Sequence, residues 1–196
     1  MVSREQETAE AARLARRAVE LGGDDAVALC FAGLTMGYVV GDIENGAAFV
    51  DQALALNSNL AAAWSASGWM KLCLGELDTA MERSERAMRL SPFDRGALLW
   101  QTEMGLIHFC AGRYADASLW GERALRIQPD SAFALRVLSA SKAMAGYPEE
   151  AQNAMAQLRR ADPQLRLSNI GDVISPLRPE HRDRYIEGLR RAGLPE

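Results

Sequence analysis

The sequence predicts an all-α fold, a solenoid of stacked helix pairs, because small residues and helix-ending residues recur at a fixed spacing. Glycine recurs at intervals of 34, 37 and 34 residues, at Gly41, Gly75, Gly112 and Gly146. The same three gaps separate a second set of positions, Ala53, Ala87, Ala124 and Leu158. A third set repeats the last two gaps, at Pro92, Pro129 and Pro163. One period with a single three-residue insertion indicates a repeated supersecondary unit.

Each period has the pattern of two helices joined by a tight turn. In the second period we expect a first helix over 61–74, a turn at Gly75, and a second helix over 78–90 that ends before Pro92. Small residues, Gly68 among them, stand where the two helices must cross closely. Neither helix could bury its apolar face alone, so neighbouring pairs must stack.

This pattern resembles the tetratricopeptide repeat (TPR), a 34-residue helix-turn-helix unit. The resemblance implies a right-handed superhelix with a C-terminal capping helix. We place four repeats, at 27–60, 61–94, 98–131 and 132–165. The first repeat is the least regular, with Leu34 where a small residue is expected and Gly33 next to it. Its register is therefore open by one residue.

The two ends extend the predicted solenoid, which would span 1–196 as a single domain. Residues 5–26 form an orphan repeat helix with an apolar face that includes Leu14 and Leu21. That helix suggests a chain cut from a longer protein, and a natural N-terminal cap is the alternative. Residues 166–196 form a capping tail, in which Pro179 opens a helix that buries Tyr185, Ile186 and Leu189.

Two segments carry a more specific resemblance. Residues 91–125, with Gly112-Arg113-Tyr114 at their centre, and residues 185–196 are similar to the C-terminal repeat region of bacterial adenylate/guanylate cyclase-like signalling proteins. Related regions follow winged-helix DNA-binding domains in bacterial regulators. The resemblance implies a sensory or protein-binding module, and none of the cyclase's catalytic features occurs in this sequence.

Composition excludes several classes of protein. The 196 residues carry a net charge of −4, which disfavours nucleic acid as a partner. No run approaches the roughly 20 apolar residues that a membrane-spanning helix needs. The first residues have no apolar segment, so we expect no secretory signal there, and three cysteines do not make a disulfide framework. These features favour a cytoplasmic protein.

Residues that could carry chemistry are few. The two histidines, His108 and His181, belong to different elements, and a zinc site needs three or four ligands. Cys73 and Cys110 occupy equivalent places in successive repeats and are expected to be small core residues. No phosphate-binding loop or acid/base pair is recognisable. We therefore expect no catalytic, cofactor-binding or metal-binding residue, and no enzyme activity.

The predicted binding site is the concave face, which the first helix of each repeat lines in such solenoids. Residues about one turn apart give its lining: Phe31, Tyr38, Trp69, Leu72, Leu106, Phe109, Phe133, Arg136 and Met144. We expect about half of them to be buried against the next repeat or under the C-terminal helix. The lysine and asparagine set that clamps a terminal carboxylate in chaperone-associated repeats is missing.

The lining is mainly apolar and aromatic, so the expected ligand is an apolar helix or strand from a protein or peptide, including a domain of the same parent protein. The alternative is a sensor that closes the groove on a small molecule or short peptide. The apolar face of the orphan helix also predicts a homodimer.

Overall fold

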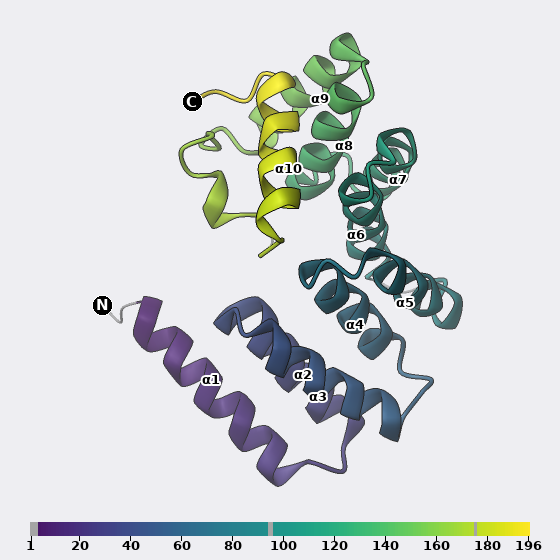
Figure 1. Ribbon diagram of the computed structural model, residues 1–196, viewed down its shortest axis with the longest axis vertical. Coiled ribbons are helices and arrows are strands. Elements are labelled where there is room, and N and C mark those ends of the chain that lie inside the picture. The colour runs from purple at the N-terminus through teal and green to yellow at the C-terminus, as the bar shows by residue number, and fades with distance from the viewer. Residues whose placement is uncertain (1–3, 94–95, 175) are drawn as a thin grey trace. The chain divides into compact units, whose positions relative to one another are not determined.

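A computed structural model describes residues 4–93, 96–174 and 176–196. Asp94, at the end of the second predicted repeat, and Ser175, in the predicted tail, lie outside the described residues. Helices and turns, with no strand, make up the described part of the chain, as expected for an all-α fold (Figure 1). In order, the helices are α1 (Arg4–Leu21), α2 (Ala26–Leu34), the π-helix η1 (Thr35–Val40), α3 (Ile43–Leu56), α4 (Ala61–Cys73), α5 (Leu77–Leu90), α6 (Ala97–Cys110), α7 (Tyr114–Ile127), α8 (Ala132–Met144), α9 (Pro148–Ala161), the 3-10 helix η2 (Ile170–Asp172) and α10 (Pro179–Arg191).

The chain divides into two compact units, Met1–Pro92 and Phe93–Glu196, called unit 1 and unit 2 below. In unit 1, α2 and η1 pack against α3, and α4 packs against α5. In unit 2, α6 packs against α7 and α8 against α9. The second helix of one pair also contacts the first helix of the next, as α3 does with α4 and α7 with α8. Helices thus stack pair on pair within each unit (Figure 1).

The recurring glycine of the sequence is the residue that ends each first helix. Gly41, Gly75, Gly112 and Gly146 have φ angles between 76° and 86°, in the left-handed region. A side chain is strained there, whereas glycine is not, so the chain can leave one helix and enter the next within a few residues. This conformational requirement explains the period that the sequence shows.

In the first two pairs, the helices cross where one of them has no side chain. A Cβ added to Gly33 would lie 2.6 Å from Val50 Cγ2 and 2.7 Å from the carbonyl oxygen of Gly46. A Cβ added to Gly68 would overlap the Ser84 hydroxyl and lie 3.1 Å from the Ala80 carbonyl oxygen. Backbone atoms form part of both contacts, so the helices could not separate slightly without losing the packing around them.

Gly33, not Leu34, occupies the crossing position of the first pair, which settles the register that the sequence left open. Gly41 lies eight positions after Gly33, whereas Gly75 lies seven positions after Gly68 and Gly112 lies seven positions after Gly105. The extra residue is accommodated by η1, where the helix widens to the π form. The turn that ends η1 is also one residue wider than in the other pairs. The Asp42 N–H donates to the Met36 carbonyl oxygen, six residues earlier, at 2.9 Å, whereas the corresponding Glu76 N–H donates to the Lys71 carbonyl oxygen, five residues earlier.

Two further helices flank the pairs. In unit 1, α1 packs against α2 and η1 and buries Ala12 and Ala15. Val19 packs beside them, whereas the two leucines point away from this contact, since Leu14 is 52% exposed and Leu21 is 71% exposed. In unit 2, α10 packs against α8 and α6 through Tyr185 and Leu189, as predicted, while Ile186 is half-buried.

We expect Gly33→Ala to lower the free energy of unfolding by about 1–2 kcal/mol. Overpacking costs about 1–3 kcal/mol, and the better helix propensity of alanine returns up to about 1 kcal/mol. Urea unfolding followed by circular dichroism measures the change. Gly171→Ala is the control, because nothing lies within 4 Å of a Cβ at that position. Equal midpoints for the two variants would contradict the close crossing at Gly33.

We also expect the three thiols to be unreactive in the folded chain. Cys30, Cys73 and Cys110 are buried and form no disulfide among the described residues. Burial raises the pKa of Cys30 to about 11 and that of Cys110 to about 12. At pH 8 only about one Cys30 thiol in a thousand would be the reactive thiolate. Titration with a coloured disulfide reagent should be slow in buffer and should count three thiols in urea. Fast reaction of one thiol in buffer would show that its surroundings open.

Candidate binding faces on the first helices

In unit 1, the predicted binding residues divide into an exposed pair and a buried pair. Phe31 and Tyr38, from α2 and η1, are 62% and 44% exposed. Trp69 and Leu72, from α4, are 4% and 0% exposed. The exposed pair therefore forms the surface, and the residues of α4 lie beneath it or in the core.

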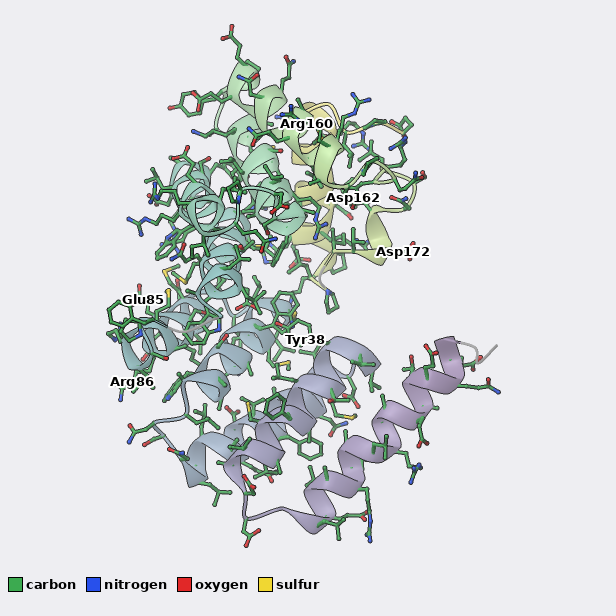
Figure 2. All side chains as sticks on the ribbon, turned by 180° about the vertical axis from the view of Figure 1, so that it is seen from behind. Tyr38, Glu85, Arg86, Arg160, Asp162 and Asp172 are labelled. Atoms are coloured by element: carbon green, nitrogen blue, oxygen red, sulfur yellow. The ribbon has the colours of Figure 1, made fainter. Side chains whose placement is uncertain are left out.

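Tyr38 and Trp69 hold each other in place. Their ring centroids lie 4.6 Å apart, and the ring planes are only 10° from parallel. Aromatic stacking of this kind contributes about 0.5–1.5 kcal/mol beyond the area it buries. Among the described residues, none accepts a hydrogen bond from the Trp69 indole N–H. Tyr38 (Figure 2) is thus presented to solvent on a fixed support.

The π-helix extends this apolar surface by one more residue. Val39 follows Tyr38 and is 55% exposed. Thr35 lies between Phe31 and Tyr38 in the sequence, and its hydroxyl donates to the Phe31 carbonyl oxygen at 2.9 Å. The strip Phe31, Tyr38 and Val39, called the α2–η1 strip below, is apolar and remains in contact with solvent. The sequence did not single out Val39 or the π-helix.

In unit 2, the predicted binding residues are mostly covered. Leu106, Phe109 and Arg136 are buried, while Phe133 and Met144 are half-buried. Part of the cover is α10, which Figure 1 shows alongside α8. The ring of Tyr185 meets that of Phe109 edge-on, with centroids 5.2 Å apart.

Arg136 is the charged residue among the predicted set, and it is only 8% exposed. Its guanidinium lies 5.6 Å from the ring centroid of Phe133 and donates from Nη2 to the Val173 carbonyl oxygen at 3.3 Å. No described carboxylate forms an ion pair with it. Burial raises the pKa of the neighbouring Tyr185 hydroxyl, and the positive charge of Arg136 opposes that rise.

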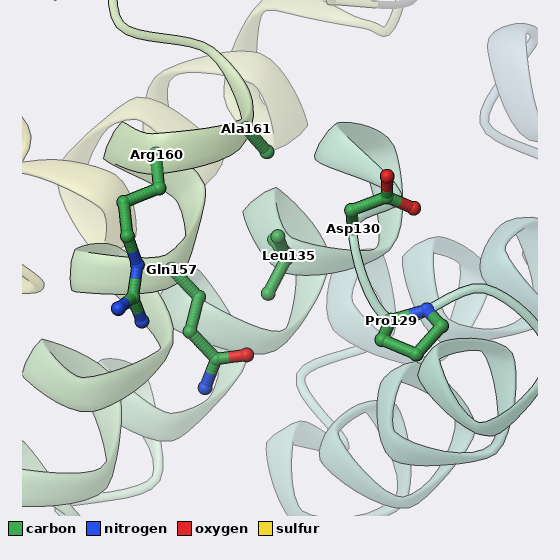
Figure 3. A pocket seen from close by; sticks show the side chains of 6 residues that line it. All are labelled: Pro129, Asp130, Leu135, Gln157, Arg160 and Ala161. Atoms are coloured by element: carbon green, nitrogen blue, oxygen red, sulfur yellow. The ribbon is translucent and has the colours of Figure 1, made fainter.

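A cavity of about 420 Å³ lies elsewhere in unit 2, between the turn that precedes α8 and the last turns of α9. Figure 3 shows Leu135 at its centre, with Arg160 and Gln157 on one side and Asp130 and Pro129 on the other. None of the predicted binding residues lines it.

The two histidines, His108 and His181, are possible metal ligands by residue type, and each lies in a different helix. His108 Nδ1 is 3.9 Å from an oxygen of Asp116, and burial lowers the pKa of His181. The described residues contain no group of three or more His, Cys, Asp or Glu side chains placed to hold a metal ion. Within the same residues, no helix is both long and apolar enough to cross a membrane.

No protein-family model and no curated protein matches this sequence. Solved structures do match. The chain superimposes on PilW, described as a widely conserved type IV pilus biogenesis factor, with a TM-score of 0.75 and 18% identity over 95% of this chain and 91% of that chain. It superimposes on YrrB, described as a TPR protein with an unusual peptide-binding site, with a TM-score of 0.62 and 21% identity over 92% of this chain and 91% of that one.

A thermophilic TPR protein of Thermus thermophilus gives a TM-score of 0.67 and 17% identity over 91% of this chain and 89% of that chain. At these identities the likeness concerns the fold. Together with the helix pairs and the glycine-ended first helices, it shows that the chain has the tetratricopeptide-repeat fold that the sequence predicts.

Proposed function

We propose that this chain is a non-catalytic protein-interaction module that binds a peptide or protein segment on the α2–η1 strip of unit 1. The observation that carries the proposal is the exposure of Phe31, at 62%, on the same helical segment as an aromatic ring that is already stacked on its support. Isolated exposed apolar residues are common, but three of them along one continuous helical segment form a patch of the kind that partners cover.

The strip has the physical properties of a binding hot spot. Tyr38 is held by Trp69 before any ligand arrives, so little side-chain entropy is lost on binding. Aromatic residues supply large apolar area and are enriched among the residues that dominate interface energies. A π-helical turn is rare and is frequently found at functional sites, which is consistent with retention of η1 for binding.

The chemistry of the strip favours an apolar or aromatic side chain on the ligand. Lys71, the one lysine of unit 1, lies 2.9 Å from a carboxylate oxygen of Glu76. Lys71 is thereby engaged locally, which disfavours a terminal carboxylate as the recognised group. YrrB, which shares the fold, is a TPR protein with a peptide-binding site, and this supports peptide binding here by analogy of fold.

For the wider context we propose the regulatory region of a bacterial signalling protein, in the cytoplasm, with a domain of the same protein as a candidate partner. The resemblance of residues 91–125 and 185–196 to cyclase-like and winged-helix proteins supports it. The coding sequence around this region tests it. A neighbouring cyclase or winged-helix domain in the same reading frame would support the proposal, and an unrelated open reading frame would contradict it.

A second candidate function is the sensing of a small molecule. The cavity of about 420 Å³ beside Leu135 and Arg160 is the observation that favours it, although it lies away from the predicted groove. A saturating ligand at a hundredfold excess over its Kd would stabilise the chain by about 2.7 kcal/mol. Thermal-shift screening of metabolites against wild type and Arg160→Ala would identify such a ligand.

We expect Phe31→Asp to weaken peptide binding by about 30-fold or more, because loss of a hot-spot contact costs about 2 kcal/mol or more. The ligands are peptides selected on the immobilised full chain from a random displayed library, and titration calorimetry measures each Kd. Trp69 is unsuitable for this test, because it is buried and its replacement would disturb folding.

Leu119→Asp is the matched control, since Leu119 is 54% exposed and lies on α7, a second helix. Both variants should keep the helical spectrum and the melting temperature of the wild type. Selected peptides that bind Phe31→Asp and wild type equally would remove the strip as the binding site.

We further propose a homodimer through the outer face of α1, supported by the exposure of Leu14 and Leu21. Light scattering of the full chain at high concentration should give twice the mass of 21.4 kDa. Leu14→Glu combined with Leu21→Glu should return it to that mass, because two desolvated carboxylates cannot enter such an interface. A monomeric wild type at every concentration would exclude the dimer.

A further inference from the structure

The cavity of about 420 Å³ in unit 2 has three polar side chains in its lining, Asp130, Gln157 and Arg160. Within the described residues, none of these three side chains has a hydrogen bond or an ion pair. The rest of the lining is apolar and includes Leu135, which is 1% exposed. The cavity therefore combines an apolar surface with a few polar groups that remain available to a ligand.

The two charged side chains have opposite signs and lie on opposite sides of the cavity. Arg160, from the last turn of α9, is on one side of Leu135, and Asp130, from the turn before α8, is on the other (Figure 3). The cavity lies between them, and they form no ion pair with each other. A ligand that carries both charges could contact both residues, with its cation at Asp130 and its anion at Arg160.

The backbone on both sides of the cavity is held in place before a ligand binds. In the turn before α8, the Ser131 N–H donates to the Gln128 carbonyl oxygen at 3.2 Å. At the end of α9, Leu158 is fully buried, and its carbonyl oxygen accepts from the Asp162 N–H at 2.7 Å. Binding would thus order side chains only, which limits its entropic cost.

Two opposite charges on either side of an apolar surface fit a short peptide with free ends. Such a peptide has an ammonium at one end, a carboxylate at the other and apolar side chains between them. Gln157, on the same side as Arg160, offers a donor and an acceptor to the peptide group. A free amino acid fits less well, because its two charges are attached to one carbon atom. The volume is within the range of about 300–1,000 Å³ that small-ligand sites have.

We propose that this cavity binds a dipeptide that has two free ends and apolar side chains. Arg160 donates to the terminal carboxylate, Asp130 accepts from the terminal ammonium, and the apolar side chains lie against Leu135. None of the residues predicted for the concave face lines this cavity. The proposal rests on the second candidate function, the sensing of a small molecule, and names the class of ligand.

Titration calorimetry of the full chain with leucyl-leucine tests the proposal, at low ionic strength because salt screens exposed charges. We expect saturable binding. Acetylation of the amino end or amidation of the carboxyl end should each weaken it about 10-fold, because each removes one charge-assisted contact. Free leucine should bind at least as weakly as the capped peptides. Absence of saturable heat up to about 10 mM leucyl-leucine, or equal binding of the capped peptides, would overturn the proposal.

Variants assign each end of the dipeptide to its residue. Arg160→Ala should weaken the binding of leucyl-leucine about 10-fold but leave that of its amide unchanged, because the amide lacks the same contact. Asp130→Asn should do the same for leucyl-leucine and its acetylated form. Arg159→Ala is the matched control, since Arg159 is the neighbouring exposed arginine of α9 and does not line the cavity. Equal losses in Arg159→Ala and Arg160→Ala would indicate general charge attraction and contradict the site.

The outcomes separate this proposal from the functions on which it builds. If leucyl-leucine does not bind but a metabolite stabilises wild type and not Arg160→Ala, the cavity is a sensor site and the dipeptide is the wrong ligand. Phe31→Asp should bind leucyl-leucine as wild type does, because Phe31 belongs to unit 1 and the cavity to unit 2. Loss of peptide binding on the α2–η1 strip would therefore leave the cavity proposal unaffected.

Discussion

The closest helix crossings are made by residues that have no side chain. At Gly33 and Gly68, the backbone of one helix rests on backbone and small side chains of its partner, and the larger residues of both helices fill the space around that contact. Met70 is an example. It is fully buried, and its thioether occupies the space left by Gly37 and Gly46. If the crossing were wider, these side chains would line cavities, and each missing contact would reduce the stability of the pair.

The first pair shows how the fold tolerates an irregular sequence. The distance along the chain from the crossing glycine to the turn glycine is one residue longer than in the next two pairs. Both ends of that segment are fixed, one by packing on Val50 and the other by the left-handed turn at Gly41. The surplus residue must therefore be accommodated between them, and η1 is the result. The wider turn places Tyr38 over Trp69 and leaves Val39 at the surface.

Much of the fold could be predicted from sequence because its determinants are local and periodic. The turn glycines reflect a backbone requirement that recurs in each pair, and a crossing glycine recurs in the first three pairs. The eight-position spacing from Gly33 to Gly41 is the sequence signal that corresponds to the π-helix. The candidate site was less predictable. A periodic pattern identifies the first helices, but the burial of Phe109 and Arg136 depends on α10, which begins about 70 residues after the end of α6. No repeat pattern encodes such a contact, although the face of Tyr185 and Leu189 was recognisable as one that had to be buried.

The π-helix also has a consequence for how this surface could change over generations. Each residue of an α-helix advances the chain by about 100° around the helix axis. With η1 in place, the surplus residue is compensated within one turn, and Phe31 and Tyr38 both remain exposed. A single-codon deletion within η1 would restore a regular helix between the same two fixed glycines. A single-codon insertion in α2 between Phe31 and Gly33 would instead rotate Phe31 by about a quarter turn relative to Tyr38. A change of one codon can thus alter the orientation of Phe31 relative to Tyr38, while the crossing of the pair and the turn at Gly41 remain intact.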